Sequence, residues 1–536
     1  MRNDLQLIQS VFCEIKVPET YIKKILYNNE NTGNRFNLYK INISFKYKGL
    51  IDIWFFAILQ RQDDLASSEE KVINEGFDIF YYCMENDYMP LVIINDNEEI
   101  NLKGKFAHDE KYVFFIDQTD LPTKDNYPRN IRNTPLINSI KNRLGVNNIK
   151  KLCPYIPQEP AEGWRFFGRK KEQELLTDTK TNVFIIGGRK LGKTSLVRQF
   201  MNFQEKNNNP CYYVPTQNIR TEHELVESIG FVLSKKMLLR AKRESSQLNS
   251  NFLLILLKKF KVQKNKLPTL IIDEVGGVIQ YSSRDAWNVF GVLREFSQTG
   301  NIRIILTAFQ EIVLKQFLEF ESPFVNFAKN LRLRVFNNSE VKECIIEPLS
   351  LWATIKDQNK FLETILEKVG NHPYLIQFVG EYLFDKLFED GVDDIEECLD
   401  FLFTSSDLEI YREAVETMFF NLPSSLEKFL FLHFCLDASE SKSPINKFEI
   451  SHKRTKEILE AEVNLYLDFE KIRLLLERIE LRGLITNIRS NHNRYHITAP
   501  AIYYYLEKFY SPIHELMYEY KSEAKENGLV ENLFQI

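Results

Sequence analysis

The chain lacks the features that mark secreted, membrane-spanning and metal-clustered proteins. Its seven cysteines, spread through 536 residues, form no C-x-x-C pair, which argues against both a zinc site and a disulfide framework. No apolar run is long enough to cross a bilayer, and the N-terminal residues do not resemble a secretory leader. We therefore expect a cytoplasmic protein with reduced thiols and no membrane segment.

An excess of one charge is also lacking. The formal net charge is −5, so bulk charge does not predict binding to a polyanion, and any contact with nucleic acid needs a local basic patch. Hydrophobic residues make up 44% and charged residues 27%, a globular balance that no visible repeat or low-complexity tract interrupts. A chain of this length is too long to fold around a single hydrophobic core, so roughly three or four domains are expected.

The stretch GGRKLGKT, residues 187–194, fits the pattern G-x-x-x-x-G-K-[ST]. An apolar run precedes it and a helical pattern follows, which is the strand–loop–helix setting of a phosphate-binding loop (P-loop). Inward N–H groups and the helix dipole would face phosphate oxygens, the lysine would add a charge for the β- and γ-phosphates, and the threonine would bind Mg²⁺. The residues predicted to bind ATP or ADP are Gly187, Gly188, Arg189, Lys190, Leu191, Gly192, Lys193, Thr194 and Ser195.

Two acids follow a second apolar strand, residues 269–272. This Walker B arrangement predicts that Asp273 holds Mg²⁺ together with Thr194, and that Glu274 polarises the attacking water as a general base. The alternative, two solvated acids at a strand end, is disfavoured because a P-loop precedes them. Thr307 ends the next predicted strand and would sense the γ-phosphate, unless it merely completes that strand end.

Residues 1–150 are rich in predicted strands and favour an α/β or α+β module. The strands are expected at 41–47, 50–59, 91–94 and 112–116, with a helix within 68–84. A nuclease pattern is disfavoured, because the lysine it needs is missing where Asp52, Gln60 and Arg61 stand. An interaction or sensor module is the default expectation.

After a Pro-rich connector, strands alternate with helices, which predicts a parallel sheet covered on both faces. The pattern then turns helical, and three helices with two strands near the end predict a winged helix. The expected fold is therefore an α/β P-loop NTPase sheet with a helical lid and a C-terminal winged helix. The expected boundaries are 1–150 for the N-terminal module, 151–165 for the linker, 166–337 for the ATPase core, 338–418 for the lid, 419–512 for the winged helix and 513–536 for a tail.

Four short motifs occur in order along this region: FGRxxE from residue 167, the P-loop, IDE from residue 272 and GNHPYL from residue 370. Over residues 160–510 the series resembles the bacterial and archaeal AAA-like ATPases of the STAND class, which are related to origin-recognition ATPases. The resemblance implies use in phage defence or stress signalling. It also implies contacts with the adenine or its surroundings from Phe167, Gly168, Arg169, His372 and Pro373.

Together these observations predict an ATP-dependent switch, with Mg²⁺ as cofactor, that controls a protein partner or self-assembly. One alternative is a DNA-binding initiator or loader. The predicted recognition helix, 469–482, mixes acids with bases, whereas the wing carries Arg489, His492 and Arg494. Another alternative is an ATP-binding scaffold that never hydrolyses. The candidates for an arginine finger, each more simply explained by a salt bridge, are Arg294, Arg332 and Arg334.

Overall fold

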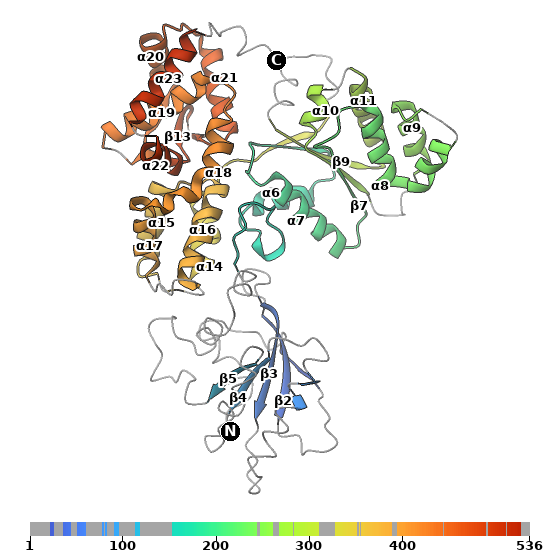
Figure 1. Ribbon diagram of the computed structural model, residues 1–536. Helices are drawn as coiled ribbons and strands as arrows, with labels where there is room; N and C mark the ends of the chain where they lie inside the picture. Colours follow the sequence, from blue (N-terminus) through green and yellow to red (C-terminus); the bar gives the residue numbers. More distant parts are fainter. Residues whose placement is uncertain are drawn as a thin grey trace.

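The computed structural model describes residues 22–25, 36–43, 51–59, 78–79, 81–82, 91–95, 113–117 and 153–526, the last range without 244–246, 261–266, 282–283, 310–326, 351–352, 354, 389–393, 443, 489–490 and 511. An N-terminal sheet, a central sheet flanked by helices and a mainly helical C-terminal body follow one another along the chain (Figure 1). Among the residues described, no helix is long and apolar enough to cross a membrane.

The N-terminal sheet has mixed strand directions. Its order is β1-β2-β3-β4-β5; the first three strands are antiparallel and the last three parallel. The predicted strands that correspond to β3, β4 and β5 are confirmed. The strand expected at 41–47 is β2, which begins and ends earlier, and β1 was not predicted. Asp52 lies in β3, while Gln60 and Arg61 are outside the described residues. The bounds are β1 (Ile22–Ile25), β2 (Phe36–Ile43), β3 (Ile51–Leu59), β4 (Leu91–Asn95) and β5 (Val113–Asp117).

The central sheet is parallel, as predicted, with the order β10-β6-β9-β8-β7. Its strands are β6 (Val183–Ile186), β7 (Cys211–Pro215), β8 (Thr269–Asp273), β9 (Arg303–Ala308) and β10 (Lys329–Arg332). Its helices are α6 (Lys170–Asp178), α7 (Lys193–Lys206), α8 (Glu222–Arg243), α9 (Ser250–Lys259), α10 (Gly276–Tyr281) and α11 (Arg284–Gln298).

Both faces of this sheet are buried under helices, and the side chains of each strand point alternately to one face and to the other. Val183 and Ile185 of β6 pack in a cluster with α6 and α7, whereas Phe184 and Ile186 pack in a second cluster with α8, α9 and α11. Parallel strands end at the same edge, where ligands bind in such sheets. The P-loop after β6, Thr307 of β9 and Asp273 of β8 therefore meet at one edge.

The lid is a series of helices around α16. Its first helix is capped by Asn337, whose Oδ1 accepts from the N–H groups of Ser339 (2.9 Å) and Glu340 (3.1 Å). The bounds are α13 (Asn338–Val341), η5 (Lys342–Ile346), α14 (Glu347–Leu349), α15 (Gln358–Lys368), α16 (Pro373–Phe388), α17 (Ile395–Thr404), η6 (Ser406–Tyr411), α18 (Arg412–Val415) and η7 (Glu416–Phe420).

The C-terminal region contains the expected three helices and a wing, with additions. The strand β11 was not predicted, and it pairs with β13, the second strand of the wing. The segment expected as a tail begins with α23, which packs on α19. The bounds are α19 (Ser425–Glu440), η8 (Ile445–Lys447), β11 (Glu449–Ser451), α20 (His452–Ile458), η9 (Leu459–Val463), α21 (Phe469–Leu481), β12 (Ile485–Ile488), β13 (Asn491–Ile497), α22 (Pro500–Phe509) and α23 (Ile513–Glu526).

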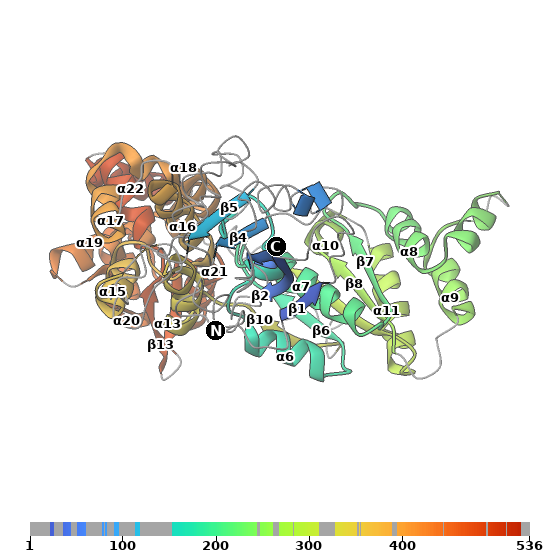
Figure 2. The same ribbon diagram turned by 90° about the horizontal axis from the view of Figure 1, so that it is seen from below.

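The lid and the winged helix share one hydrophobic core. Ile365 and Phe384 of the lid belong to the same buried cluster as Leu475 and Ile502 of the winged helix. Both views place the helices of these two parts in one body beside the central sheet (Figures 1 and 2). The lid and the winged helix are therefore packed together as one body.

Candidate nucleotide-binding site

The P-loop is closed by its own lysine. Lys193 Nζ donates to the carbonyl oxygens of Gly187 (2.9 Å) and Gly188 (2.8 Å), and the lysine side chain is buried. Lys190 and Gly192 have φ angles of 61° and 88°, and left-handed residues of this kind turn successive N–H groups toward one point. These hydrogen bonds and left-handed residues therefore favour a loop whose N–H groups already point toward one site, with the Lys193 ammonium beside it.

Asp273 collects three hydroxyl donors. Its Oδ2 accepts from Thr194 Oγ1 (3.1 Å) and from the Tyr213 hydroxyl (2.8 Å), and its Oδ1 accepts from the Thr307 hydroxyl. The two predicted Mg²⁺ ligands, Thr194 and Asp273, are thus brought together as hard oxygen donors. In the described parts of the chain no three His, Cys, Asp or Glu side chains gather around a point, so a cation here would also need phosphate oxygens and water.

Tyr213 is a member of this group that the sequence reasoning missed. It pairs with Ile271 in the β7–β8 register, two residues before the pair of Pro215 with Asp273. Side chains two residues apart share a face of a sheet, so Tyr213 and Asp273 project to the same side. Burial, and next the Asp273 carboxylate, raise the pKa of the Tyr213 hydroxyl, which therefore remains a donor at neutral pH. Only the strand order could have revealed this neighbour.

Glu274 is exposed and lines the cavity in front of the P-loop. Its φ is 62°, and its N–H donates to Thr307 Oγ1 at 2.8 Å. Thr307 is fully buried and does not line the cavity. Its hydroxyl donates to the Asp273 carboxylate and accepts from the main-chain N–H of Glu274. This placement gives no support to the predicted contact of Thr307 with the γ-phosphate.

A cavity of about 690 Å³ opens between the P-loop, the Pro-rich connector and the lid, a size that suits a nucleotide. Aromatic rings contribute to its wall: Phe166, Phe167, Phe309, Phe336 and Tyr374. Basic side chains in the cavity wall outnumber acidic ones. The acidic residues are Glu159 and Glu274, and the basic residues are Arg165, Arg169, Arg189, Lys190, Lys193 and Arg220. Such a lining favours a ligand that joins a polyanion to an aromatic ring.

The connector joins the P-loop helix to the lid. The N–H of Ala161 donates to Ser195 Oγ (3.0 Å), so this predicted ligand residue holds the connector. At the other side, the N–H of Ile156 donates to Gln377 Oε1 on α16 (3.0 Å). Tyr155 is buried against α16, where a Cβ on Gly380 would lie 2.5 Å from the tyrosine ring. The connector therefore forms part of the cavity wall.

Arg169 braces the P-loop. Its guanidinium donates to the carbonyl oxygen of Leu191 (3.1 Å), and its backbone N–H donates to Glu340 Oε1 of the lid (2.9 Å). Gly168 has a φ of 67°, and a Cβ there would lie 3.2 Å from the Glu340 side chain. Arg169 and Phe167 line the cavity, but the bonds of Arg169 go to protein atoms. The predicted adenine contact thus remains a prediction for Phe167, while Arg169 acts on the loop.

His372 and Pro373 are placed differently from one another. Pro373 lines the cavity, whereas His372 is fully buried and does not. The His372 Nδ1 accepts from the N–H of Tyr374 (3.2 Å), and a Cβ on Gly483 would lie 2.4 Å from the ring. Burial lowers the pKa of His372 to about 3, so the ring is neutral at ordinary pH. His372 therefore belongs to the contact with the winged helix, and a contact with the base has no support.

The end of α21 lies directly on the P-loop. A Cβ built on Gly188 would come within 1.8 Å of the carbonyl oxygen of Leu481, so only glycine fits this approach. The Leu481 side chain joins the hydrophobic cluster of the central sheet. Next to it, the Arg482 guanidinium lies 4.4 Å from the centre of the Phe309 ring. The negative end of the α21 dipole thus faces the loop that is predicted to bind phosphate.

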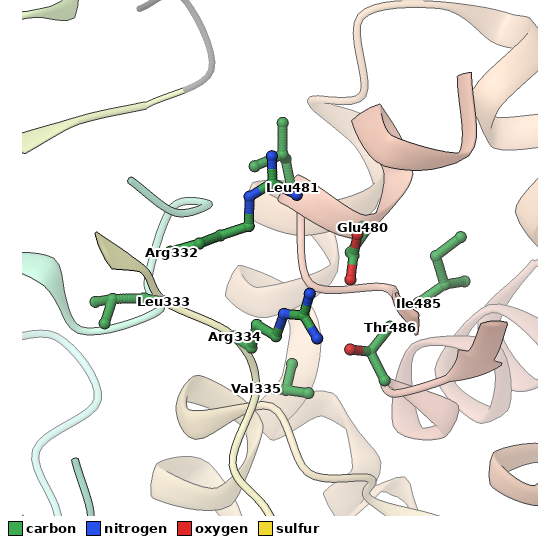
Figure 3. Close-up of a pocket in the computed structure, with 8 residues that line it drawn as sticks. All are labelled: Arg332, Leu333, Arg334, Val335, Glu480, Leu481, Ile485 and Thr486. Carbon is green, nitrogen blue, oxygen red and sulfur yellow. The ribbon is translucent and has the colours of Figure 1, made fainter. Parts of the chain in front are cut away.

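A small crevice of about 10 Å³ marks the same interface (Figure 3). Arg332 and Arg334 project from β10 and the segment after it, and Arg334 points toward Glu480 of α21 and Thr486 of β12. Burial raises the pKa of Glu477, and the charge of Arg332 opposes this shift most strongly. These two candidates for an arginine finger therefore lie at an internal contact.

No protein family profile and no curated protein matches this chain. Among solved structures, it is similar to the Walker-type ATPase PABY2304 of Pyrococcus abyssi, with 16% identity and a TM-score of 0.42 over 64% of this chain and 96% of that chain. It is also similar to the ORC2 protein of Aeropyrum pernix in ADPNP–ADP complexes, with 13% identity and a TM-score of 0.42 over 67% of this chain and 94% of that one. Cdc6p of Pyrobaculum aerophilum matches with 13% identity and a TM-score of 0.33 over 66% and 94% of the two chains. These similarities are distant.

Proposed function

We propose that this chain is an ATP-binding and ATP-hydrolysing switch of the STAND class, in which the nucleotide decides whether the winged helix stays on the P-loop. The approach of Leu481 to Gly188 carries this proposal, because it joins the phosphate site to the winged helix without an intervening element. Release of the winged helix would move the lid through their shared core and free surfaces for a protein partner or for self-assembly.

The chemistry is assigned to residues at the edge of the sheet. The P-loop and Lys193 bind the phosphates, and Thr194 and Asp273 hold Mg²⁺, which neutralises phosphate charge when bound. Glu274 takes a proton from the water whose oxygen bonds to the γ-phosphorus, while the bond to the β–γ bridging oxygen breaks and ADP leaves. The hydrogen bond from the Glu274 N–H to Thr307 fixes the main chain that carries this carboxylate.

The rival function, a DNA reader, has less support. Arg494 of the wing pairs with Glu449, and the C-terminal end of α21 is covered by the central sheet. Arg489 and the side chain of His492 lie outside the described part of the chain. A recognition helix that is packed on its own ATPase core favours a switch over a grip on DNA.

Equilibrium ATP binding to the wild type and to Lys193→Ala tests this function. The loss of a charged donor at the phosphates should weaken binding about 10-fold to 100-fold. Lys206→Ala is the matched control, because Lys206 is an exposed lysine at the far end of the same helix. Equal affinity of the wild type and Lys193→Ala would remove the phosphate site from this loop.

A further inference from the structure

Lys190 connects the P-loop to the lid. Its Nζ lies 4.5 Å from the centre of the Tyr374 ring, at the start of α16. The Tyr374 hydroxyl donates to Glu413 Oε1 on α18 (2.7 Å), and Phe378 packs edge-on against the same ring at 4.8 Å. A cation over the face of an aromatic ring is attracted by the ring electrons, and the ring here is fixed by its neighbours.

The presence of a lysine at this position calls for an explanation. Lys190 has a φ of 61°, a conformation that glycine adopts without strain, and the P-loop pattern requires no particular side chain there. Lys190 and Tyr374 line the same cavity as Lys193, Thr194 and Glu274. The ammonium therefore lies where either the lid or a phosphate tail can bind it.

We propose that Lys190 is a γ-phosphate-dependent link between the P-loop and the lid, which binds Tyr374 in the absence of a triphosphate and the γ-phosphate in its presence. This inference rests on the proposed ATP site. A charge-assisted hydrogen bond to phosphate is stronger than a cation–π contact, so ATP takes the ammonium from the ring. ADP lacks the competing group and leaves the contact with the lid in place.

Calorimetric binding of ADP and of a non-hydrolysable ATP analogue to the full chain tests the link. Lys190→Met keeps the apolar stem and removes the charge, and it should weaken binding of the analogue about 10-fold while ADP affinity stays within about twofold. Lys190→Arg keeps the charge and should preserve the preference for the triphosphate. Thermal melts of each variant exclude a general loss of folding.

The ring provides the second half of the test. Tyr374→Leu removes the competitor for the ammonium and should tighten binding of the ATP analogue relative to ADP about threefold. Tyr374→Phe keeps the ring face and should show no such gain. In a Lys190→Met background the gain from Tyr374→Leu should vanish, because the two residues act through one contact.

The outcomes separate this inference from the function on which it rests. If Lys190→Met weakens both nucleotides equally, or if the effects of the two variants simply add, the link is refuted while the nucleotide site stands. If the wild type binds neither nucleotide, both the link and the proposed function fail.

Discussion

Gly188→Ala is the substitution that most selectively separates the winged helix from the P-loop. The added Cβ would start 1.8 Å from the Leu481 carbonyl oxygen, and real Cβ contacts essentially never fall below 3.0 Å, so the end of α21 has to move away. The obstructing atom is backbone, which cannot rotate aside. Overpacking of this kind costs about 1–3 kcal/mol, which shifts the balance between docked and released winged helix by about 5-fold to 150-fold.

The rate of fluorescent ADP release measures this shift. The P-loop pattern accepts any residue at position 188, so the variant should still bind nucleotide, but ADP should leave at least about fivefold faster because the lid is no longer held down. Gly291→Ala on α11 is the control, since a Cβ there has nothing within 4 Å. An ADP release rate equal to that of the wild type would refute the idea that docking retains the nucleotide.

Three further changes test the chemistry and the buried histidine. Glu274→Gln should keep ATP binding and lower phosphate release about 100-fold or more; unchanged turnover would remove Glu274 from the mechanism. Tyr213→Phe, which removes a donor to Asp273, should raise the Mg²⁺ concentration for half-maximal turnover about threefold to tenfold with little change at saturation; an unaltered Mg²⁺ titration would contradict this role. Burial lowers the pKa of His372 to about 3 from 6.5, so the unfolded chain binds a proton that the folded chain excludes, and stability falls by up to about 1.4 kcal/mol per pH unit below about pH 6.5. His372→Asn retains an acceptor for the N–H of Tyr374 and should flatten this part of the pH dependence in urea titrations; the same slope in both proteins would contradict the assignment.

Local patterns were sufficient for the parts of the site that lie on one segment. The P-loop and the Walker B acids could be predicted, because each follows an apolar strand of its own. The helix caps at Ser424 and Asp468 are equally local, because each side chain accepts from the N–H three residues later, at 3.3 Å and 2.8 Å. These features depend on neighbours a few residues apart.

Features that depend on distant packing were not predictable. Tyr213 reaches Asp273 only because β7 lies beside β8, and Gly188 is required by a helix that comes almost three hundred residues later. Thr307 was placed at the correct edge, but its burial, which decides its role, follows from the strand order. The cap of α13 is Asn337 and not the nearby Ser339, whose hydroxyl donates to Asn337 Oδ1 at 2.6 Å while Asn337 and Glu340 form a capping box.

Hydrogen exchange at the end of α21 tests the switch most directly. The N–H groups of Arg482 and Gly483 donate to the carbonyl oxygens of Ile479 (3.2 Å) and Glu480 (2.8 Å), so these amides report on the turn that covers the P-loop. With ADP we expect them to remain protected, and with a non-hydrolysable ATP analogue we expect exchange to accelerate as the turn leaves Gly188. Equal protection with both nucleotides, under conditions where each is shown to be bound, would contradict the proposed coupling.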